Sequence, residues 1–459
     1  MSDALPIRVM RASSFLVVVL LLQFWVLATP WLKSKALLHD NLFHYSMFHD
    51  EWESLNKFGV HVWNLDGYPT GRATYLIGVL NSPSLFAPMG RCFGGGALRV
   101  GRLGFHPAGW MPFYVFYFAI VAPWLFVVAC WLAARQVFGA AAQCYVIAVA
   151  AFSPAVLLNL TDVGHLEHLA WFVLWMTAVT AFVNCSGRWQ RFSLWFCTVA
   201  LALTANHLFL MFEVWALPLF LLLLLLWPRA VKTVRREWLT LAGVVTVAAL
   251  VWLITYLPAL SQVRGYSRSG NDGLTYGASM IHPGNILEVL LQDPRVGFDW
   301  VGNSFAAMRG GFSYGYIGVF ALPLLVIGLG NFDSRLYAAL LVATVCMVMV
   351  LTLHPVWEKI ASLYPLSTNR HWADCTWRAG GFLLVLFLSA FGLSKLPSQI
   401  QWLILVLTLG DVVGSSAHKV GEWKRHHQYL VVNDTNARNE IGLRQPEPNF
   451  TARTLLVTP

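Results

Sequence analysis

The chain has 459 residues, of which 57% are hydrophobic and only 12% charged, and its formal net charge is +9. Average soluble domains carry about 25% charged residues, so this composition argues against a soluble protein and indicates that the lipid bilayer is the solvent. The cations are scattered at the ends of apolar segments and form no basic face or tail, so nucleic acid is not expected as a partner.

Apolar segments long enough to cross a bilayer recur along the chain. A spanning helix needs about 20 mainly apolar residues. The first such segment follows Arg8 and Arg11 and is too long for the apolar core of a signal peptide, so we expect it to be an uncleaved helix. The sequence therefore predicts an all-α polytopic bundle of about eleven spans, near residues 13–32, 110–134, 138–158, 166–184, 191–207, 208–227, 238–258, 313–330, 335–353, 379–394 and 399–415.

Basic residues predict the orientation of these spans, because cytoplasmic loops carry an excess of Lys and Arg. With the N-terminus inside, every short basic connection lies on one side, and the strongest is PRAVKTVRRE at 228–237. The basic residues of these connections are Arg135, Arg188, Arg191, Arg229, Lys232, Arg235, Arg236, Arg335 and Lys395. The bundle then covers residues 1–415, and the opposite face receives the loops 33–109 and 259–312 and the tail 416–459.

The first outer loop is expected to open with an amphipathic helix on the membrane surface. Apolar side chains recur at helical spacing between Leu42 and Leu55, beside several charged residues. Asp40 lies close to the end of the first span, where a partly desolvated carboxylate is a candidate general base. Asp50 is a second carboxylate candidate. The alternative is that the acidic residues only form the wet face of this helix, which is our interpretation of Glu51 and Glu53.

A second polar segment, NLTDVGHLEHLAWF, opens the fourth span. His165 and His168 are three residues apart and share one helix face, with Asp162 at an N-cap-like position and Glu167 off that face. Two His and a carboxylate are possible ligands for a divalent metal. The spacing is not diagnostic, so no metal site is assigned, and simple helix capping by Asp162 stays open.

Three further segments supply polar candidates. His207 interrupts an apolar stretch, where an ionisable group usually faces a polar cavity or a buried partner. Arg264 and Arg268 are suited to phosphate, because the guanidinium fork matches phosphate oxygens, although anionic lipid headgroups are an equal alternative. Arg378 precedes a Gly-Gly pair that allows close approach of another helix or a ligand.

The order of these motifs resembles the YfhO-like family of bacterial membrane proteins, within the GT-C superfamily of polyprenyl-phosphate-dependent glycosyltransferases. The similarity covers most of residues 10–415. The matching positions, in chain order, are Asp40 and Tyr45, Gly59 with Trp63 and Asn64, Gly67 and Pro69, Gly164 and His165, His207, Ser267 and Arg268, Tyr316 to Gly318, and Arg378.

The resemblance implies an inverting glycosyltransferase of the bacterial cytoplasmic (inner) membrane that moves a hexose or pentose from a polyprenyl-phosphate donor. It implies that Asp40 deprotonates the acceptor and that Arg268 and Arg378 hold the lipid phosphate. His165 and His207 would orient a substrate. The other expected substrate-binding residues are Tyr45, Trp63, Asn64, Asp162 and Arg264. Membrane lipids and the lipid-linked sugar are the expected partners, with no certain cofactor.

Two other functions remain open on the sequence. The first is a noncatalytic subunit of a larger membrane complex built on the same bundle, which the short tail and the 21 Trp residues favour. The second is a transporter or flippase for lipid-linked sugars. Transporters often contain two related halves with broken helices, and the sequence has no evident internal repeat.

Overall fold

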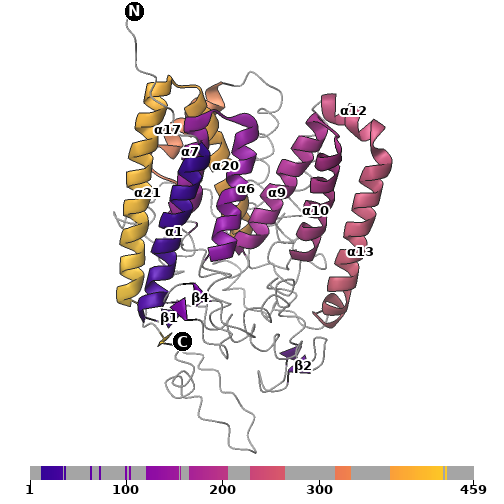
Figure 1. Cartoon of the computed structure of the whole chain (residues 1–459), viewed down its shortest axis with the longest axis horizontal. Coiled ribbons are helices and arrows are strands. Elements are labelled where there is room, and N and C mark those ends of the chain that lie inside the picture. Colours follow the sequence, from indigo (N-terminus) through magenta and orange to yellow (C-terminus); the bar gives the residue numbers. More distant parts are fainter. Residues whose placement is uncertain are drawn as a thin grey trace, which may run out of the picture.

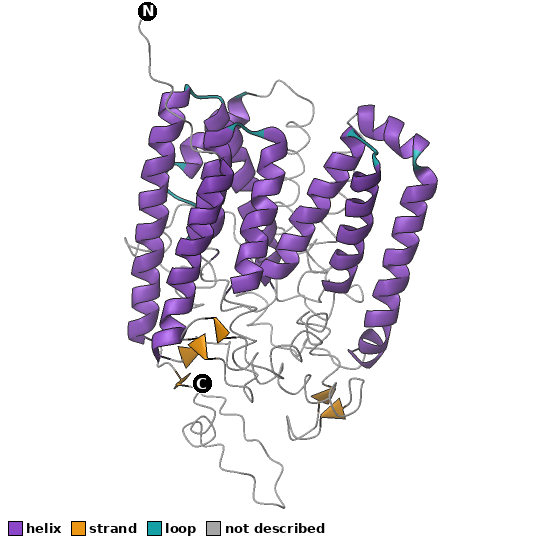
Figure 2. Cartoon of the chain, viewed as in Figure 1, coloured by secondary structure: helices purple, strands orange, loops and turns teal. Residues whose placement is uncertain are grey.

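The computed structural model is a bundle of long helices with three short two-stranded pairings (Figures 1 and 2). It describes residues 12–34, 36–37, 63–64, 72–73, 99–100, 103–104, 120–154, 156, 165–204, 228–263, 316–331, 373–426 and 430–431. The helices are α1 (Ala12–Ser34), α6 (Ala122–Val137), α7 (Ala140–Phe152), α9 (His165–Asn184), α10 (Arg188–Thr204), α12 (Pro228–Arg236), α13 (Trp238–Val263), α17 (Ala321–Gly330), α20 (Ala373–Ser394) and α21 (Ser398–His426).

The strand pairings are each two residues long and antiparallel. β1 (Ala36–Leu37) pairs with β6 (Leu430–Val431), β2 (Trp63–Asn64) with β3 (Arg72–Ala73), and β4 (Arg99–Val100) with β5 (Leu103–Gly104). The described chain is therefore mostly helical, as predicted, with these short pairings added. The predicted turn-rich segment around Gly67 and Pro69 lies between β2 and β3.

Most predicted spans coincide with described helices. The spans at 208–227 and 335–353 and the surface helix of the first loop lie outside the described residues, so the count of eleven stays a prediction. Over the described side chains, Ser398–His418 of α21 alone has the length and hydropathy to cross a membrane as one segment. Shorter apolar stretches occur in α1, α6, α7, α9, α17 and α20.

α7 is the central helix of one half of the bundle. It packs against α1, α6, α20 and α21. Nearly every residue from Ala141 to Phe152 is buried, and many of them are Ala. A helix that is hydrophobic all round belongs in the interior, and small side chains let its neighbours approach closely. α7 ends where Ser153 turns extended ahead of Pro154, because a residue before proline is disfavoured in the helical conformation.

The other half of the bundle is built from α9, α10, α12 and α13, and α6 joins it through α9. A small separate cluster of Phe182, Leu194 and Val244 packs α9, α10 and α13 together. Large apolar side chains also point away from the protein, such as Leu21 on α1 and Val406 on α21. Exposed apolar faces on long helices are expected where lipid tails, rather than water, surround the protein.

Besides the early end of α7, four further differences from the predicted helices have a local cause. The basic segment 228–236, expected as a loop, is the helix α12: Pro228 opens it, and Ala230 and Thr233 form a buried face at helical spacing. α17 begins at Ala321 rather than near 313, because Gly318 has a φ of 113° that no α-helix accommodates.

The other two differences extend helices into polar sequence. α20 starts at Ala373 and not near 379, so Arg378 lies inside the helix. α21 continues to His426, past the expected end near 415. Hydropathy detects only the apolar core of a helix, whereas polar residues at either end can keep the same backbone hydrogen bonds in water.

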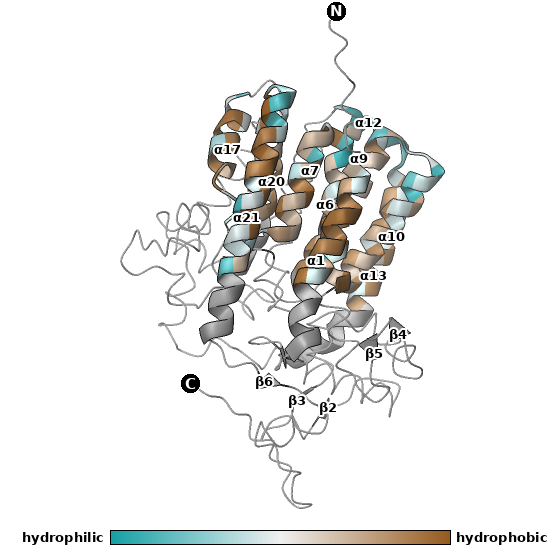
Figure 3. Cartoon of the chain, turned by 60° about the vertical axis from the view of Figure 1, so that its left-hand side comes forward, coloured by the Kyte–Doolittle hydropathy of each residue, from teal (hydrophilic) through white to brown (hydrophobic). Residues whose placement is uncertain are grey.

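Polar residues gather at one end of the helices. The connections between α6 and α7, between α9 and α10 and between α20 and α21 lie at the same end as α12 (Figure 1). Figure 3 shows hydrophilic residues concentrated there and hydrophobic residues along the helices. We call this the basic end, because it carries Arg135, Arg188, Arg229, Lys232, Arg235, Arg236 and Lys395. The described short basic connections therefore share one side of the bundle, as predicted.

Candidate functional site

The structure describes the backbone at only some of the predicted site residues. His165 is the first residue of α9, Arg378 lies in the second turn of α20, and Trp63 and Asn64 form β2. The backbone of α9 places His165 and His168 at the expected spacing on one helix. The remaining predicted site residues lie outside the described residues: Asp40, Tyr45, Asp50, Asp162, His207, Arg264 and Arg268.

The helices bring several of these positions to the end of the bundle opposite the basic end. α9 and α20 each run towards the basic end, so His165 and the start of α20 lie at the other end (Figure 1). α1 ends there too. β1 follows it at once, and Leu37 pairs with Leu430 at the start of the C-terminal tail. The chain that leads into Asp40, the start of α9 and the start of the tail therefore share one side.

A carboxylate lies in the middle of α21, within the segment that can cross a membrane. The Tyr316 hydroxyl donates a 2.8 Å hydrogen bond to Oδ2 of Asp411, and the Val319 backbone N–H donates another of 2.8 Å to the same oxygen. Tyr316 is buried, and Asp411 is half-buried. An acidic group at membrane depth is costly unless it is paired or solvated, so these two donors stabilise it there.

Gly318 allows this arrangement. Its φ of 113° lies in the left-handed region, and a Cβ at this position would approach Thr408 Cγ2 and Val412 Cγ1 at 3.3 Å. The backbone of residues 316–319 therefore lies directly against α21. The Tyr-Ile-Gly motif thus acts as a turn that docks the chain entering α17 onto the face of α21 that carries Asp411.

We predict that Tyr316→Phe lowers the free energy of unfolding by about 1.5 kcal/mol, because a partly buried hydrogen bond to the Asp411 carboxyl group is lost. The measurement is the unfolding midpoint of the purified protein in mixed micelles. Asp411→Leu and the double variant complete a thermodynamic cycle. If Tyr316→Phe costs as much in the Asp411→Leu background as in the wild type, the contact with Asp411 is not its cause.

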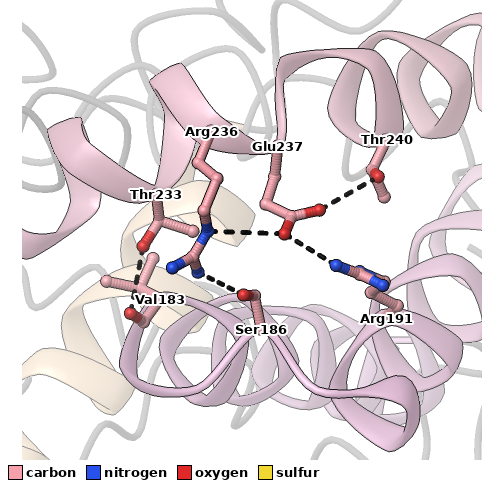
Figure 4. A network of polar contacts seen from close by, with 7 residues as sticks. All are labelled: Val183, Ser186, Arg191, Thr233, Arg236, Glu237 and Thr240. Carbon is pink, nitrogen blue, oxygen red and sulfur yellow. Dashed lines mark hydrogen bonds and ion pairs between the residues drawn. The ribbon is translucent and has the colours of Figure 1, made fainter.

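A second polar network lies at the basic end, between α12, α13 and the connection of α9 to α10 (Figure 4). Glu237 is its centre and its side chain is 8% exposed. Arg191 Nη2 donates to Glu237 Oε1 at 2.7 Å, and Arg236 Nε lies 3.5 Å from the same oxygen. Thr240 donates to Oε2 at 3.2 Å. The network holds α12 against α10.

The Arg191 hydrogen bond holds the pKa of the Glu237 carboxyl below its ordinary value. A lowered folded-state pKa stabilises the protein at pH above the unfolded value, and this contribution is lost as pH falls through the folded pKa. Glu237→Gln should therefore lower the Tm at pH 7, and the difference from wild type should shrink below about pH 4.

The matched pair Arg191→Gln and Arg188→Gln controls this prediction. Arg191 contacts Glu237, whereas no ion pair joins Arg188 to another residue of the described chain. Arg191→Gln should reproduce the loss at pH 7, and Arg188→Gln should leave the Tm near the wild-type value. A Glu237→Gln deficit that is the same at pH 7 and pH 3.5 would show that the charge of Glu237 does not contribute.

Two acidic residues of the interior were missed or undervalued by the sequence interpretation. Asp411 interrupts an apolar span, and that alone marks a residue with a buried polar partner. Glu167 is fully buried in the first turn of α9, where a carboxylate is favoured by the helix dipole. Among the described residues, no group of three or more His, Cys, Asp or Glu side chains lies close enough to hold a metal ion.

The fold is similar to that of solved oligosaccharyltransferases from Archaeoglobus fulgidus. The apo crystal structure of that enzyme matches 95% of this chain with a TM-score of 0.51 and 14% sequence identity. This similarity concerns the arrangement of the helices, and the sequence identity is low. It spans 58% of the length of that oligosaccharyltransferase.

Two further structures of oligosaccharyltransferase from the same organism are also similar. One, AglB in complex with an inhibitory peptide and a dolichol-phosphate, has 14% identity and a TM-score of 0.48, covering 90% of this chain and 55% of that one. The other, a complex with Zn and sulfate, has 13% identity and a TM-score of 0.49, covering 95% and 56%. No family model and no curated protein matches the chain, so membership of the YfhO-like family stays a prediction.

Proposed function

We propose that this protein is an integral membrane glycosyltransferase that transfers a sugar from a polyprenyl-phosphate donor to an acceptor at the outer face of the bacterial cytoplasmic membrane. The observation that carries the proposal is the fold similarity to a solved oligosaccharyltransferase, which covers 95% of the chain. The end of the bundle opposite the basic end supports it, because α1 ends and α9 begins at that end.

The proposed reaction is a single displacement at the anomeric carbon. Asp40 removes the proton of an acceptor hydroxyl as its oxygen attacks that carbon, with Asp50 as the alternative base. The bond from the anomeric carbon to the phosphate oxygen breaks, and polyprenyl phosphate leaves with the electron pair. The anomeric configuration is inverted.

Cationic side chains would stabilise the leaving phosphate. The proposed phosphate ligands are Arg264, Arg268 and Arg378. Their guanidinium groups would stabilise the negative charge that develops on the phosphate oxygens as the bond breaks. The remaining proposed residues would position the sugar and the acceptor. They are Tyr45, Trp63, Asn64, Asp162, His165 and His207.

The test is sugar transfer by the purified protein in proteoliposomes. Polyprenyl-phosphate-linked hexoses and pentoses, each labelled in the sugar, are supplied with envelope glycan extract as acceptor. The proposal expects labelled acceptor together with free polyprenyl phosphate. Movement of the intact donor across the vesicle membrane without transfer would indicate a transporter. A stoichiometric complex with other membrane proteins, inactive with every donor, would indicate a noncatalytic subunit.

A further inference from the structure

α12 lies across the basic end of the bundle rather than along it. It is bent by 83° from α13, which follows after the single residue Glu237 (Figure 1). α13 is 26 residues long and runs with the other long helices. If α13 crosses a bilayer, α12 lies nearly parallel to the membrane plane. This is the position of an interfacial helix.

One face of α12 is attached to the bundle. Ala230 and Thr233 are buried, and Thr233 Oγ1 donates a 3.2 Å hydrogen bond to the carbonyl of Val183 at the end of α9. Arg236 Nη2 hydrogen-bonds Ser186 in the connection to α10, as drawn in Figure 4. These contacts and the Glu237 network fix the rotation of α12 about its own axis.

The opposite face of α12 carries cations that the described protein does not neutralise. Arg229, Lys232 and Arg235 recur every three residues and are exposed. None of them forms an ion pair with another residue of the described chain, and the nearby carboxylate of Glu237 is already held by Arg191 and Arg236. The attached face therefore leaves these three positive charges on one side of α12, without a carboxylate partner among the described residues.

Exposed aromatic rings lie at the same end of the bundle as α12. Trp189 at the start of α10 is 75% exposed, and Trp238 at the start of α13 is 59% exposed. Trp side chains favour the boundary between lipid headgroups and acyl chains. Their exposure at the basic end supports placing this end of the bundle, with α12, at the level of the lipid headgroups.

We propose that α12 is a binding surface for anionic phospholipid headgroups, with Arg229, Lys232 and Arg235 as its ligands. Charge complementarity selects this occupant, because clustered cations at headgroup depth attract the negatively charged leaflet surface. The surface lies at the opposite end of the bundle from the end of α1 and the start of α9. It therefore does not depend on the glycosyltransferase reaction.

The test compares the binding of phosphatidylglycerol and phosphatidylcholine with identical acyl chains. The purified full-length protein is mixed with equal amounts of both, and bound lipids are counted by native mass spectrometry. Wild type should retain more phosphatidylglycerol, and the preference should fall with added salt because salt screens exposed charges. In the variant Arg229→Gln/Lys232→Gln/Arg235→Gln, the preference for phosphatidylglycerol should be roughly ten- to a hundred-fold lower than in wild type.

The matched control removes three charges from the same end but not from α12: Arg135→Gln/Arg188→Gln/Lys395→Gln. It should keep the wild-type preference, and both variants should unfold at temperatures near wild type. Equal loss in both variants would show a diffuse charge effect and overturn the proposal. An unchanged preference in the α12 variant would also overturn it. Loss of an acidic copurifying protein, with lipid preference intact, would assign the surface to that partner instead.

Discussion

Replacing Asp40 by Asn is expected to lower kcat/KM for sugar transfer by about 10² to 10⁴-fold, the usual contribution of a general base. Asn has nearly the same shape and can still accept a hydrogen bond, but it cannot take the acceptor proton. Substrate binding should change little, so the loss should appear in kcat rather than in KM. The measurement is the initial rate of labelled sugar transfer in proteoliposomes.

Glu53→Gln is the matched control for Asp40→Asn. Both replacements remove one carboxylate from the first outer loop, and Glu53 is expected on the wet face of the surface helix. Its rate should stay within about twofold of wild type, because an exposed charge away from the reaction contributes little. Full activity of Asp40→Asn, with normal membrane insertion, would exclude Asp40 as the base. A selective loss in Asp50→Asn would move that role to Asp50.

Apolar runs predicted most described helices, because a helix inside a bilayer must be apolar over its whole length. The sequence did not predict α12, because this segment is polar. It is a nine-residue helix with four cations, so its hydropathy is that of a loop. What makes it helical is the periodic burial of Ala230 and Thr233 against α9, a tertiary contact that sequence alone does not contain.

The contact between the Tyr-Ile-Gly motif and α21 could not be predicted from the sequence. The motif was recognised, but it was placed inside a span. Its partner Asp411 is 95 positions beyond Tyr316, and no spacing rule links the two. Only the packing of residues 316–319 on α21 shows that a left-handed Gly and a membrane-depth carboxylate belong to one arrangement.

Whether the candidate catalytic residues come together is equally hard to predict from the sequence. Asp40, His165 and Arg378 come from segments far apart in the chain. The orientation of the spans predicts a common side for them. In the described chain, α1 ends and α9 and α20 begin at one end of the bundle, and Asp40 lies outside the described residues. Their convergence around one sugar depends on side-chain positions in the outer loops, which hydrophobic patterning does not determine.

Replacing Gly392 by Ala is expected to destabilise the protein by about 3 kcal/mol, at the upper end of overpacking effects. α17 and α20 cross with Gly328 facing Gly392. A Cβ on Gly392 would lie 2.8 Å from the carbonyl carbon of Leu324 and 2.9 Å from the nitrogen of Gly328, and closer still to the Leu324 carbonyl oxygen. These are backbone atoms, so no side-chain rotation relieves the overlap.

Gly410→Ala is the matched control. Gly410 lies inside α21, and no atom of the described residues comes within 4 Å of its added Cβ. Ala is the better helix former by about 1 kcal/mol, so this replacement should be neutral or stabilising. The same Gly-to-Ala change should therefore lower the unfolding midpoint at Gly392 and leave it unchanged or raise it at Gly410.

Gly392→Ala should also affect sugar transfer. To admit the methyl group, α17 and α20 must separate, which would also stretch the 2.9 Å hydrogen bond from the Ser389 hydroxyl to the Ala321 carbonyl. α20 carries Arg378 at its other end, so a change in its tilt would move a proposed phosphate ligand. We expect sugar transfer to fall with stability in Gly392→Ala and to be unchanged in Gly410→Ala. Equal midpoints for the two variants would show that α17 and α20 do not pack through Gly328 and Gly392.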